Sequence, residues 1–126
     1  MLKHIKSLLL DNSRVIALVI TSIIITLSLI NTKSLASTNI KVSDKVMHAG
    51  AYLILIWSWL HVFSKKKQRI PILVILIFFG ILLEVLQGIL TNYRTADWQD
   101  VIANIIGLVV GLISFKKVHG FVFNET

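Results

Sequence analysis

Four long apolar runs dominate the chain and limit the folds open to it. They cover residues 15–30, 46–63, 70–90 and 101–115, with short polar segments between them. About 20 residues of apolar helix cross the hydrocarbon core of a bilayer, so the shorter runs need a few flanking residues. The runs do not alternate polar and apolar residues, which argues against strands. We therefore expect an all-α membrane bundle of four transmembrane helices over about 14–33, 45–63, 70–90 and 98–115.

The composition supports lipid as the solvent for most of this fold. Of the 126 residues, 56% are hydrophobic and only 15% are charged, so a water-soluble domain would lack the polar side chains to cover its surface. The length allows a single domain, 1–126. The absence of cysteine excludes disulfides and thiolate metal sites. The net charge of +7 does not indicate nucleic-acid binding, because the basic residues lie between the apolar runs and not along one helix face.

The placement of the basic residues predicts the orientation of the bundle. Most of them lie in the N-terminal tail, in the loop "SKKKQR" at 64–69, and in the C-terminal segment that begins with Lys116 and Lys117. The positive-inside rule then places both termini in the cytoplasm. An alternative remains open for the first run, since "SLAS" at 34–37 fits a signal-peptide cleavage site after Ala36. Cleavage there would leave three spans with the same orientation.

Polar side chains from three separate segments are expected to meet at the level of the outer leaflet. Two of these segments lie at the outer ends where the second and fourth helices begin. The third segment lies just before the outer end of the third helix. A buried carboxylate in a spanning helix costs ~2.5–3.5 kcal/mol, so Glu84 should face partners such as Lys45, His48 or Arg94 and not lipid. The set comprises Asp44, Lys45, His48, Tyr52, Glu84, Gln87, Arg94, Asp97, Asp100 and Asn104.

The same residues also have purely structural interpretations. Glu84 and Arg94 would form a buried ion pair that fixes helix packing, and Asp97 would cap the fourth helix. Gly107 and Gly111, in "GLVVG", predict close contact between helices, either within one chain or between two copies.

Three quoted segments, taken in order, resemble the VanZ-like family of small membrane proteins. They are "DKVMHAGAY" at 44–52, "EVLQ" at 84–87 and "RTADWQDVIANIIGLVVG" at 94–111. The resemblance implies a multi-pass protein of the bacterial plasma membrane. The founding member is associated with low-level resistance to teicoplanin, a glycopeptide that acts at the cell envelope, and no particular reaction is implied. The matching positions are Asp44, Lys45, His48, Tyr52, Glu84, Gln87, Arg94, Asp100, Asn104, Gly107 and Gly111.

The first functional hypothesis is a non-catalytic envelope protein that binds an amphiphile. Lys45 and Arg94 would receive a phosphate or carboxylate, and an apolar groove between helices would hold the tail. Membrane lipids, a lipid-linked envelope precursor or a glycopeptide would suit such a site. The binding residues would be Asp44, Lys45, Tyr52, Gln87, Arg94, Asp97 and Asn104.

The second hypothesis is an intramembrane enzyme with His48, Glu84 and Asp100 as catalytic residues. His48 would act as general base, and Arg94 would stabilise a developing anion. No compact metal-binding motif is present, so no metal or cofactor is assigned; a divalent ion on His48, Glu84, Asp97 and Asp100 is the alternative. A proton pathway ranks last, because the cytoplasmic halves of the helices lack matching polar residues. The oligomeric state stays open.

Overall fold

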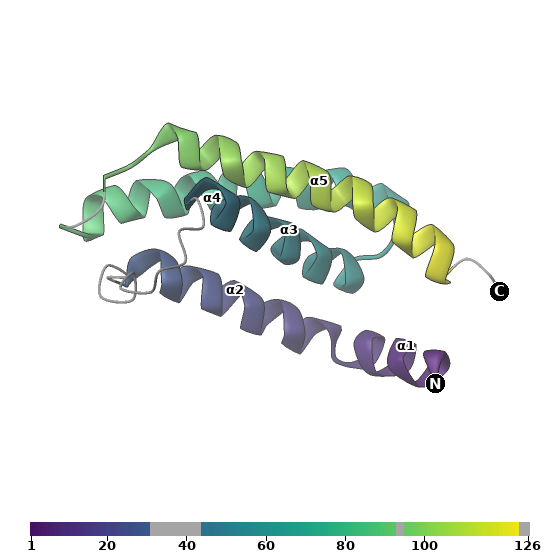
Figure 1. Cartoon of the computed structure of the whole chain (residues 1–126). Helices are drawn as coiled ribbons and strands as arrows, with labels where there is room; N and C mark the ends of the chain where they lie inside the picture. The colour runs from purple at the N-terminus through teal and green to yellow at the C-terminus, as the bar shows by residue number, and fades with distance from the viewer. Residues whose placement is uncertain (31–43, 93–94, 124–126) are drawn as a thin grey trace.

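The computed structural model describes residues 1–30, 44–92 and 95–123, and every regular element within these ranges is helical (Figure 1). The all-α class is therefore confirmed. The possible cleavage site at 34–37 and Arg94 lie outside the described residues. The elements are α1 (Leu2–Asp11), α2 (Ser13–Leu29), α3 (Asp44–Val62), the 3-10 turn η1 (Lys66–Gln68), α4 (Arg69–Leu90) and α5 (Trp98–Phe123).

Three helices differ from the predicted boundaries by more than one residue. The short helix α1 was not predicted, α2 ends at Leu29 instead of near residue 33, and α5 continues to Phe123 instead of ending near residue 115. Lys116 and Lys117 indicated the end of a span, but lysine is a good helix former and does not end the helix itself.

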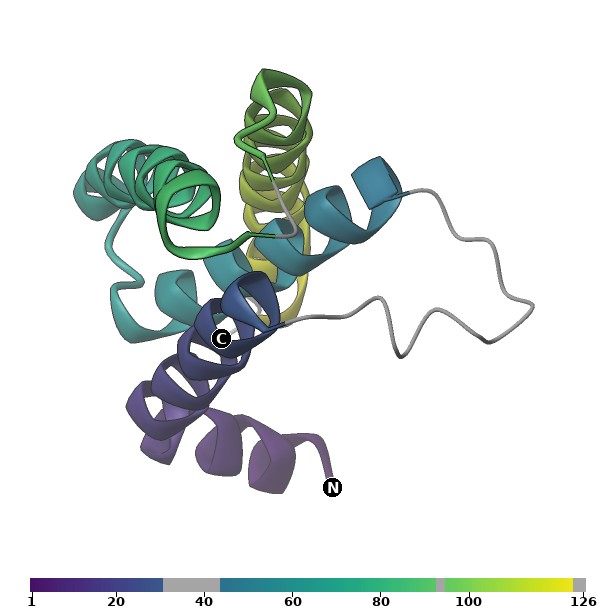
Figure 2. The same cartoon turned by 90° about the vertical axis from the view of Figure 1, so that its left-hand side faces the viewer.

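The helices α2 to α5 run alternately in opposite directions, so the start of α1 and the end of α5 lie at the same end of the bundle (Figure 1). We call this end of the bundle the terminal end. The opposite end, where α3 and α5 begin and α4 ends, is called the far end. The helix α3 contacts α1, α2, α4 and α5, and Figure 2, which looks from the far end, shows the other helices arranged around it.

The tightest contact in the core is between α3 and α5. Gly107 lies against the backbone oxygen of Ala49, and a Cβ at position 107 would collide with it. A Cβ at Gly111 would likewise collide with the Cγ2 of Ile56 and would come within 3.2 Å of the backbone oxygen of Leu53. The small residues thus let the two backbones touch within one chain.

The number of membrane spans is confirmed only in part. Two helical segments, Lys66–Leu90 and Trp98–Gly120, are long and apolar enough to cross a membrane. A third span arises if Leu2–Leu8 and Ser13–Leu29 count together, although they are bent by 63°. The helix α3 has 19 residues, about 28 Å at 1.5 Å per residue, but it carries Lys45, His48 and His61. Its central position explains its lower hydropathy, because a helix surrounded by others need not face lipid.

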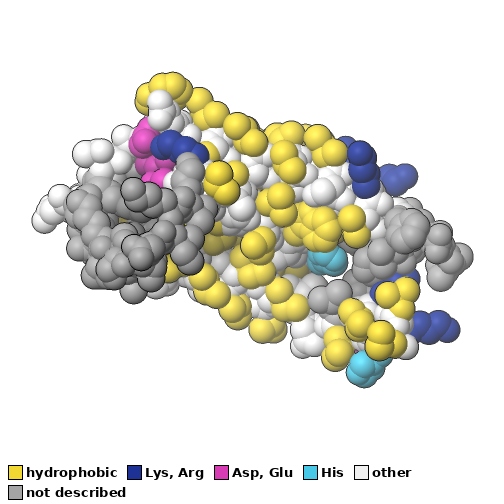
Figure 3. Space-filling model, viewed as in Figure 1, with side chains coloured by type: hydrophobic (Ala, Val, Ile, Leu, Met, Phe, Trp, Pro, Cys, Tyr) yellow, Lys and Arg dark blue, Asp and Glu magenta, His cyan; other side chains and the backbone are white. Residues whose placement is uncertain are grey.

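The outer surface matches a lipid environment over the middle of the bundle. Hydrophobic side chains cover much of the face seen in Figure 3, between the charged ends. On α4, Ile75, Phe78 and Leu82 are more than half exposed. Hydrogen bonds between helices lie behind this surface: the indole Nε1 of Trp57 donates to Ser114 Oγ on α5, and that of Trp59 donates to Thr21 Oγ1 on α2, each over 3.0 Å.

Candidate functional site

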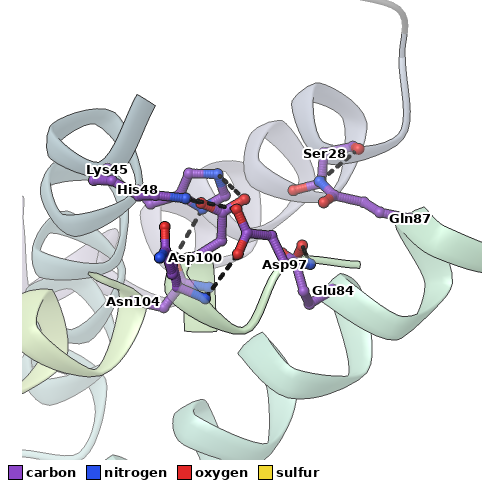
Figure 4. Close-up of polar contacts among 9 residues, drawn as sticks. Ser28, Lys45, His48, Glu84, Gln87, Asp97, Asp100 and Asn104 are labelled. Carbon is purple, nitrogen blue, oxygen red and sulfur yellow. Dashed lines mark hydrogen bonds and ion pairs between the residues drawn. The ribbon is translucent and has the colours of Figure 1, made fainter. Parts of the chain in front are cut away.

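The far end of the bundle holds a buried group of polar side chains (Figure 4). Glu84, Gln87, Asp100 and Asn104 are each 6% exposed or less, in a bundle whose core is mostly apolar. Buried polar groups of this kind cost free energy unless they are hydrogen-bonded. We call the group the polar cluster; its described members are Asp44, Lys45, His48, Tyr52, Glu84, Gln87, Asp97, Asp100 and Asn104. Hydrogen bonds and ion pairs join six of the predicted site residues to one another, whereas Gln87 bonds to Ser28 on α2; the six are Lys45, His48, Glu84, Asp97, Asp100 and Asn104.

Lys45 joins α3 to the start of α5. Its ammonium donates to Asp97 Oδ2 over 2.8 Å and also contacts Asp100 Oδ1 closely. We expected Lys45 to receive an anionic ligand or to pair with Glu84, whereas in the structure two aspartates take its charge. The Lys45 ammonium, together with the backbone N–H of Gln99, holds the pKa of Asp97 below its usual range.

His48 lies between two oxygen atoms of α5. Its Nδ1 is 3.0 Å from Asn104 Oδ1, and its Nε2 is 3.5 Å from Asp100 Oδ2. Asn104 and Asp100 therefore fix the orientation of the imidazole between them.

Within the described residues, Glu84 has a backbone amide as its hydrogen-bond partner. Its Oε1 accepts the N–H of Asp97 over 2.8 Å, while Asp97 Oδ1 accepts the N–H of Gln99 over 2.9 Å and caps α5. Gln87 likewise uses a main-chain partner, because its Nε2 donates to the carbonyl oxygen of Ser28 over 2.8 Å. The three helices α2, α4 and α5 are thereby linked at the far end.

Sequence reasoning missed two residues of the site, Gly80 and Ser28. Tyr52 and Asn104 pack on Gly80 of α4, where an added Cβ would be 3.0 Å from Tyr52 Cε1 and 3.4 Å from Asn104 Nδ2. A lone glycine inside an apolar helix is a signal of such an approach. Ser28 gave no signal, since it contributes only a carbonyl that any residue would supply.

A three-residue group at the cluster has the geometry of a cation site. Asp44, His48 and Asp100 each offer a ligand atom, and these atoms lie within 4.8 Å of one another. Oxygen and imidazole ligands suit divalent first-row metals. This set shares only His48 and Asp100 with the four ligands considered from the sequence. The ammonium of Lys45 contacts Asp100 and would compete with a bound ion for it.

An apolar cavity of about 250 Å³ lies between α2, α3 and α4. It extends from the middle of the bundle toward the terminal end, and one of its lining rings, Phe79, is 6.4 Å from the ring of Tyr52. The rings of Phe79 and Tyr52 therefore lie between the cavity and the polar cluster. The lining residues are Thr21, Trp59, Phe63, Ile72, Ile75, Leu76 and Phe79.

Comparison with known proteins decides the family. The sequence model of the VanZ/LLP1 family matches residues 11–122, nearly the whole chain. The chain belongs to the VanZ/LLP1 family. The match confirms the resemblance seen at 44–111 and extends it over α2 and the rest of α5.

A curated relative of this VanZ/LLP1 chain comes from a fungus. The chain is 34% identical over 77 residues to the uncharacterised protein C11E3.10 of Schizosaccharomyces pombe, and the alignment covers 59% of this chain and 47% of that protein. The VanZ/LLP1 chain thus spans about half the length of this relative. No solved structure matches it significantly.

Proposed function

We propose that this VanZ/LLP1 protein crosses the plasma membrane of a bacterium four times and holds its polar cluster on the outer side. The basic loop before α4 and the lysines near the end of α5 favour the cytoplasm for the terminal end. The polar cluster lies at the opposite end, where the head groups of outer-leaflet lipids would meet it.

We further propose that the polar cluster binds the head group of an anionic amphiphile, such as a lipid-linked envelope precursor. The observation that carries this proposal is the burial of Glu84, Asp100 and Asn104 at one end of an apolar bundle, which also holds an apolar cavity nearer its middle. Binding sites for small molecules combine an apolar lining with a few convergent polar groups. The cavity would accept part of the tail.

Among the described residues, the polar cluster carries more carboxylates than cations, so a bound cation would favour anion binding. Four carboxylates, from Asp44, Glu84, Asp97 and Asp100, face the single ammonium of Lys45 among the described residues of the cluster. A divalent ion on Asp44, His48 and Asp100 would supply the missing positive charge and bridge to a phosphate. Arg94, which lies outside the described residues, was predicted from the sequence to add a second cation.

Binding is tested with the purified protein in lipid nanodiscs and a polyprenyl diphosphate as probe. We expect affinity in Mn²⁺ or Mg²⁺ that chelation removes and that Asp100→Asn weakens by about tenfold or more. The matched control is Gln99→Ala, an exposed neighbour on α5, which should retain the affinity of the native chain. Binding that survives both chelation and Asp100→Asn would refute the proposal.

Catalysis is the second candidate, and the position of His48 favours it. The imidazole lies between Asp100 and Asn104, so without a cation on the ring its Nε2 would take a proton from a water molecule, and Asp100 would stabilise the resulting imidazolium. The water oxygen would bond to phosphorus, the bond to the leaving oxygen would break, and that oxygen would take up a proton. Mass spectrometry of the polyprenyl diphosphate after incubation tests this: products that His48→Gln abolishes would support hydrolysis, and an unchanged substrate would leave binding alone.

A role in glycopeptide tolerance is a separate proposal. Removal of an envelope precursor from the drug's target pool would change growth in teicoplanin. Deletion of the gene in its host and measurement of the inhibitory concentration test the link, and an unchanged concentration would exclude it.

A further inference from the structure

A second polar group surrounds Phe115 at the terminal end, where His61 was the one polar residue expected within the helices. Phe115 is only 1% exposed. The rings of His61 and His119 each lie 5.1 Å from its ring, and the guanidinium carbon of Arg69 is 5.8 Å from the ring centre. Cations are attracted to the face of an aromatic ring, which stabilises this arrangement.

The residues of this group come from four different helices. The charges of Arg69, His61 and Lys6 all act on His119, so α1, α3, α4 and α5 each contribute one basic side chain. The Nδ1 of His61 lies 2.7 Å from the carbonyl oxygen of Trp57 and donates to it, which leaves Nε2 as the second polar atom of the ring. Basic groups held together in this way repel one another unless an anion lies among them.

Arg69 provides the observation that points to a ligand. Its Nε is buried and has no hydrogen-bond partner in the described part of the chain. A buried donor without a partner is unfavourable, and the guanidinium geometry of Arg69 matches the oxygens of a phosphate.

The surroundings of Arg69 favour the phosphate of a membrane lipid over a free ion. The exposed lysines Lys65, Lys66 and Lys67 lie in the turn just before it. The helix α1 is bent from α2 by 63° and exposes both Leu2 and Lys3, as helices that lie in a membrane interface do. Basic pockets between membrane helices bind anionic head groups in this manner.

We propose that Arg69, with His61, His119 and Lys6 around it, binds the phosphate of an anionic phospholipid from the leaflet at the terminal end. This lipid site is separate from the polar cluster and does not depend on the function proposed for it. The bound lipid would neutralise the basic group and hold the ends of α3, α4 and α5 together.

Native mass spectrometry of the full chain, purified from nanodiscs that contain equal phosphatidylglycerol and phosphatidylcholine, tests the proposal. We expect one retained phosphatidylglycerol, and at least about a tenfold loss of it in Arg69→Gln. Arg69→Lys, which keeps the charge but lacks Nε, should lose most of it too. The matched control is Lys67→Gln, which removes one exposed charge nearby and should change retention less than twofold.

Three results would overturn the proposal. Equal losses in Arg69→Gln and Lys67→Gln would show only a diffuse attraction to charge. Displacement of the lipid by millimolar inorganic phosphate would show a site for free anions. A rise in retention in Glu125→Gln would show that the chain's own carboxylate occupies the site. Thermal unfolding of each variant in detergent checks that it is folded.

Discussion

At the scale of single residues, Glu84 illustrates why a carboxylate is tolerated in an apolar helix. It is 4% exposed, and it accepts the backbone N–H of Asp97 at the point where α5 begins. The carboxylate therefore fixes the entry of α5 into the bundle, and Asp97 and Asp100 follow in the position where Lys45 meets them.

The hydrogen bond of Glu84 predicts different effects for two substitutions. Glu84→Gln keeps an acceptor for the Asp97 amide and should change stability little, whereas Glu84→Ala leaves that N–H without a partner and should cost about 1–3 kcal/mol. Thermal unfolding in detergent measures both. Equal losses in the two variants would show that the negative charge matters and the hydrogen bond does not.

Asp97 predicts a dependence of stability on acid. Its pKa is held below the ordinary value chiefly by Lys45, so the folded state favours the ionised form. The stabilisation is complete above the pKa of the unfolded chain, about 3.9, and is lost as the pH falls through the lower pKa of the folded state. The difference in melting temperature between the native chain and Asp97→Asn should thus be largest near neutral pH and shrink below about pH 4. Asparagine keeps the capping oxygen, so the variant isolates the charge. A constant difference over this range would contradict the assignment.

Much of the cluster at this scale was predictable, and its individual bonds were not. The helical repeat and the alternating topology predict that Asp44, His48, Glu84 and Asp100 share one end of the bundle. Lys45 pairs with Asp97 and Asp100 and not with Glu84. This outcome depends on side-chain rotamers and on the rotation of each helix about its axis, which a sequence pattern does not specify. The group around Phe115 was missed because His61, Arg69 and His119 each stand near a different helix end and share no motif.

At the scale of helices, the contact between α3 and α5 organises the site. Gly107 follows Asn104 by about one turn, and Ala49, which it touches, is next to His48. The closeness of the two backbones therefore sets the distance between His48 and Asn104.

The contact at Gly107 predicts that an alanine substitution is unfavourable there but tolerated at Gly50, which lies outside the contact. Gly107→Ala places a Cβ against a backbone oxygen that cannot move aside, and should cost about 1–3 kcal/mol. Gly50→Ala, on α3, meets no atom within 4 Å and should be neutral or stabilise by about 0.5–1 kcal/mol through helix propensity. Thermal unfolding compares the two, and a loss in Gly50→Ala as large as in Gly107→Ala would refute the packing argument.

The helix boundaries show where sequence reasoning works. The predicted helices 45–63 and 70–90 agree with α3 and α4 to within one residue at each end. Abrupt changes from polar to apolar residues mark those ends. The predicted end of α5 was wrong because the hydrophobic span stops before the helix does. The length of a membrane span and the length of a helix are different quantities.

At the scale of the whole molecule, charge is separated along the bundle. The acidic side chains of the polar cluster gather at the far end with Lys45, and other basic side chains lie toward the terminal end (Figure 3). The apolar surface between them would align this axis with the membrane normal.

This separation predicts the orientation. A reporter that is active only outside the cytoplasm should be silent when fused after Thr126 and active when inserted between α4 and α5. Replacing Lys65, Lys66 and Lys67 with glutamine should raise the first signal. Activity of the native fusion at Thr126 would show that the terminal end faces outward.

The bond from Gln87 to Ser28 has a consequence for the evolution of this chain. Because the acceptor is a carbonyl of the main chain, residue 28 is free to mutate without loss of the bond. Covariation between aligned positions would therefore not reveal that α2 is bonded to α4 here, and α2 would look more dispensable in such comparisons than it is.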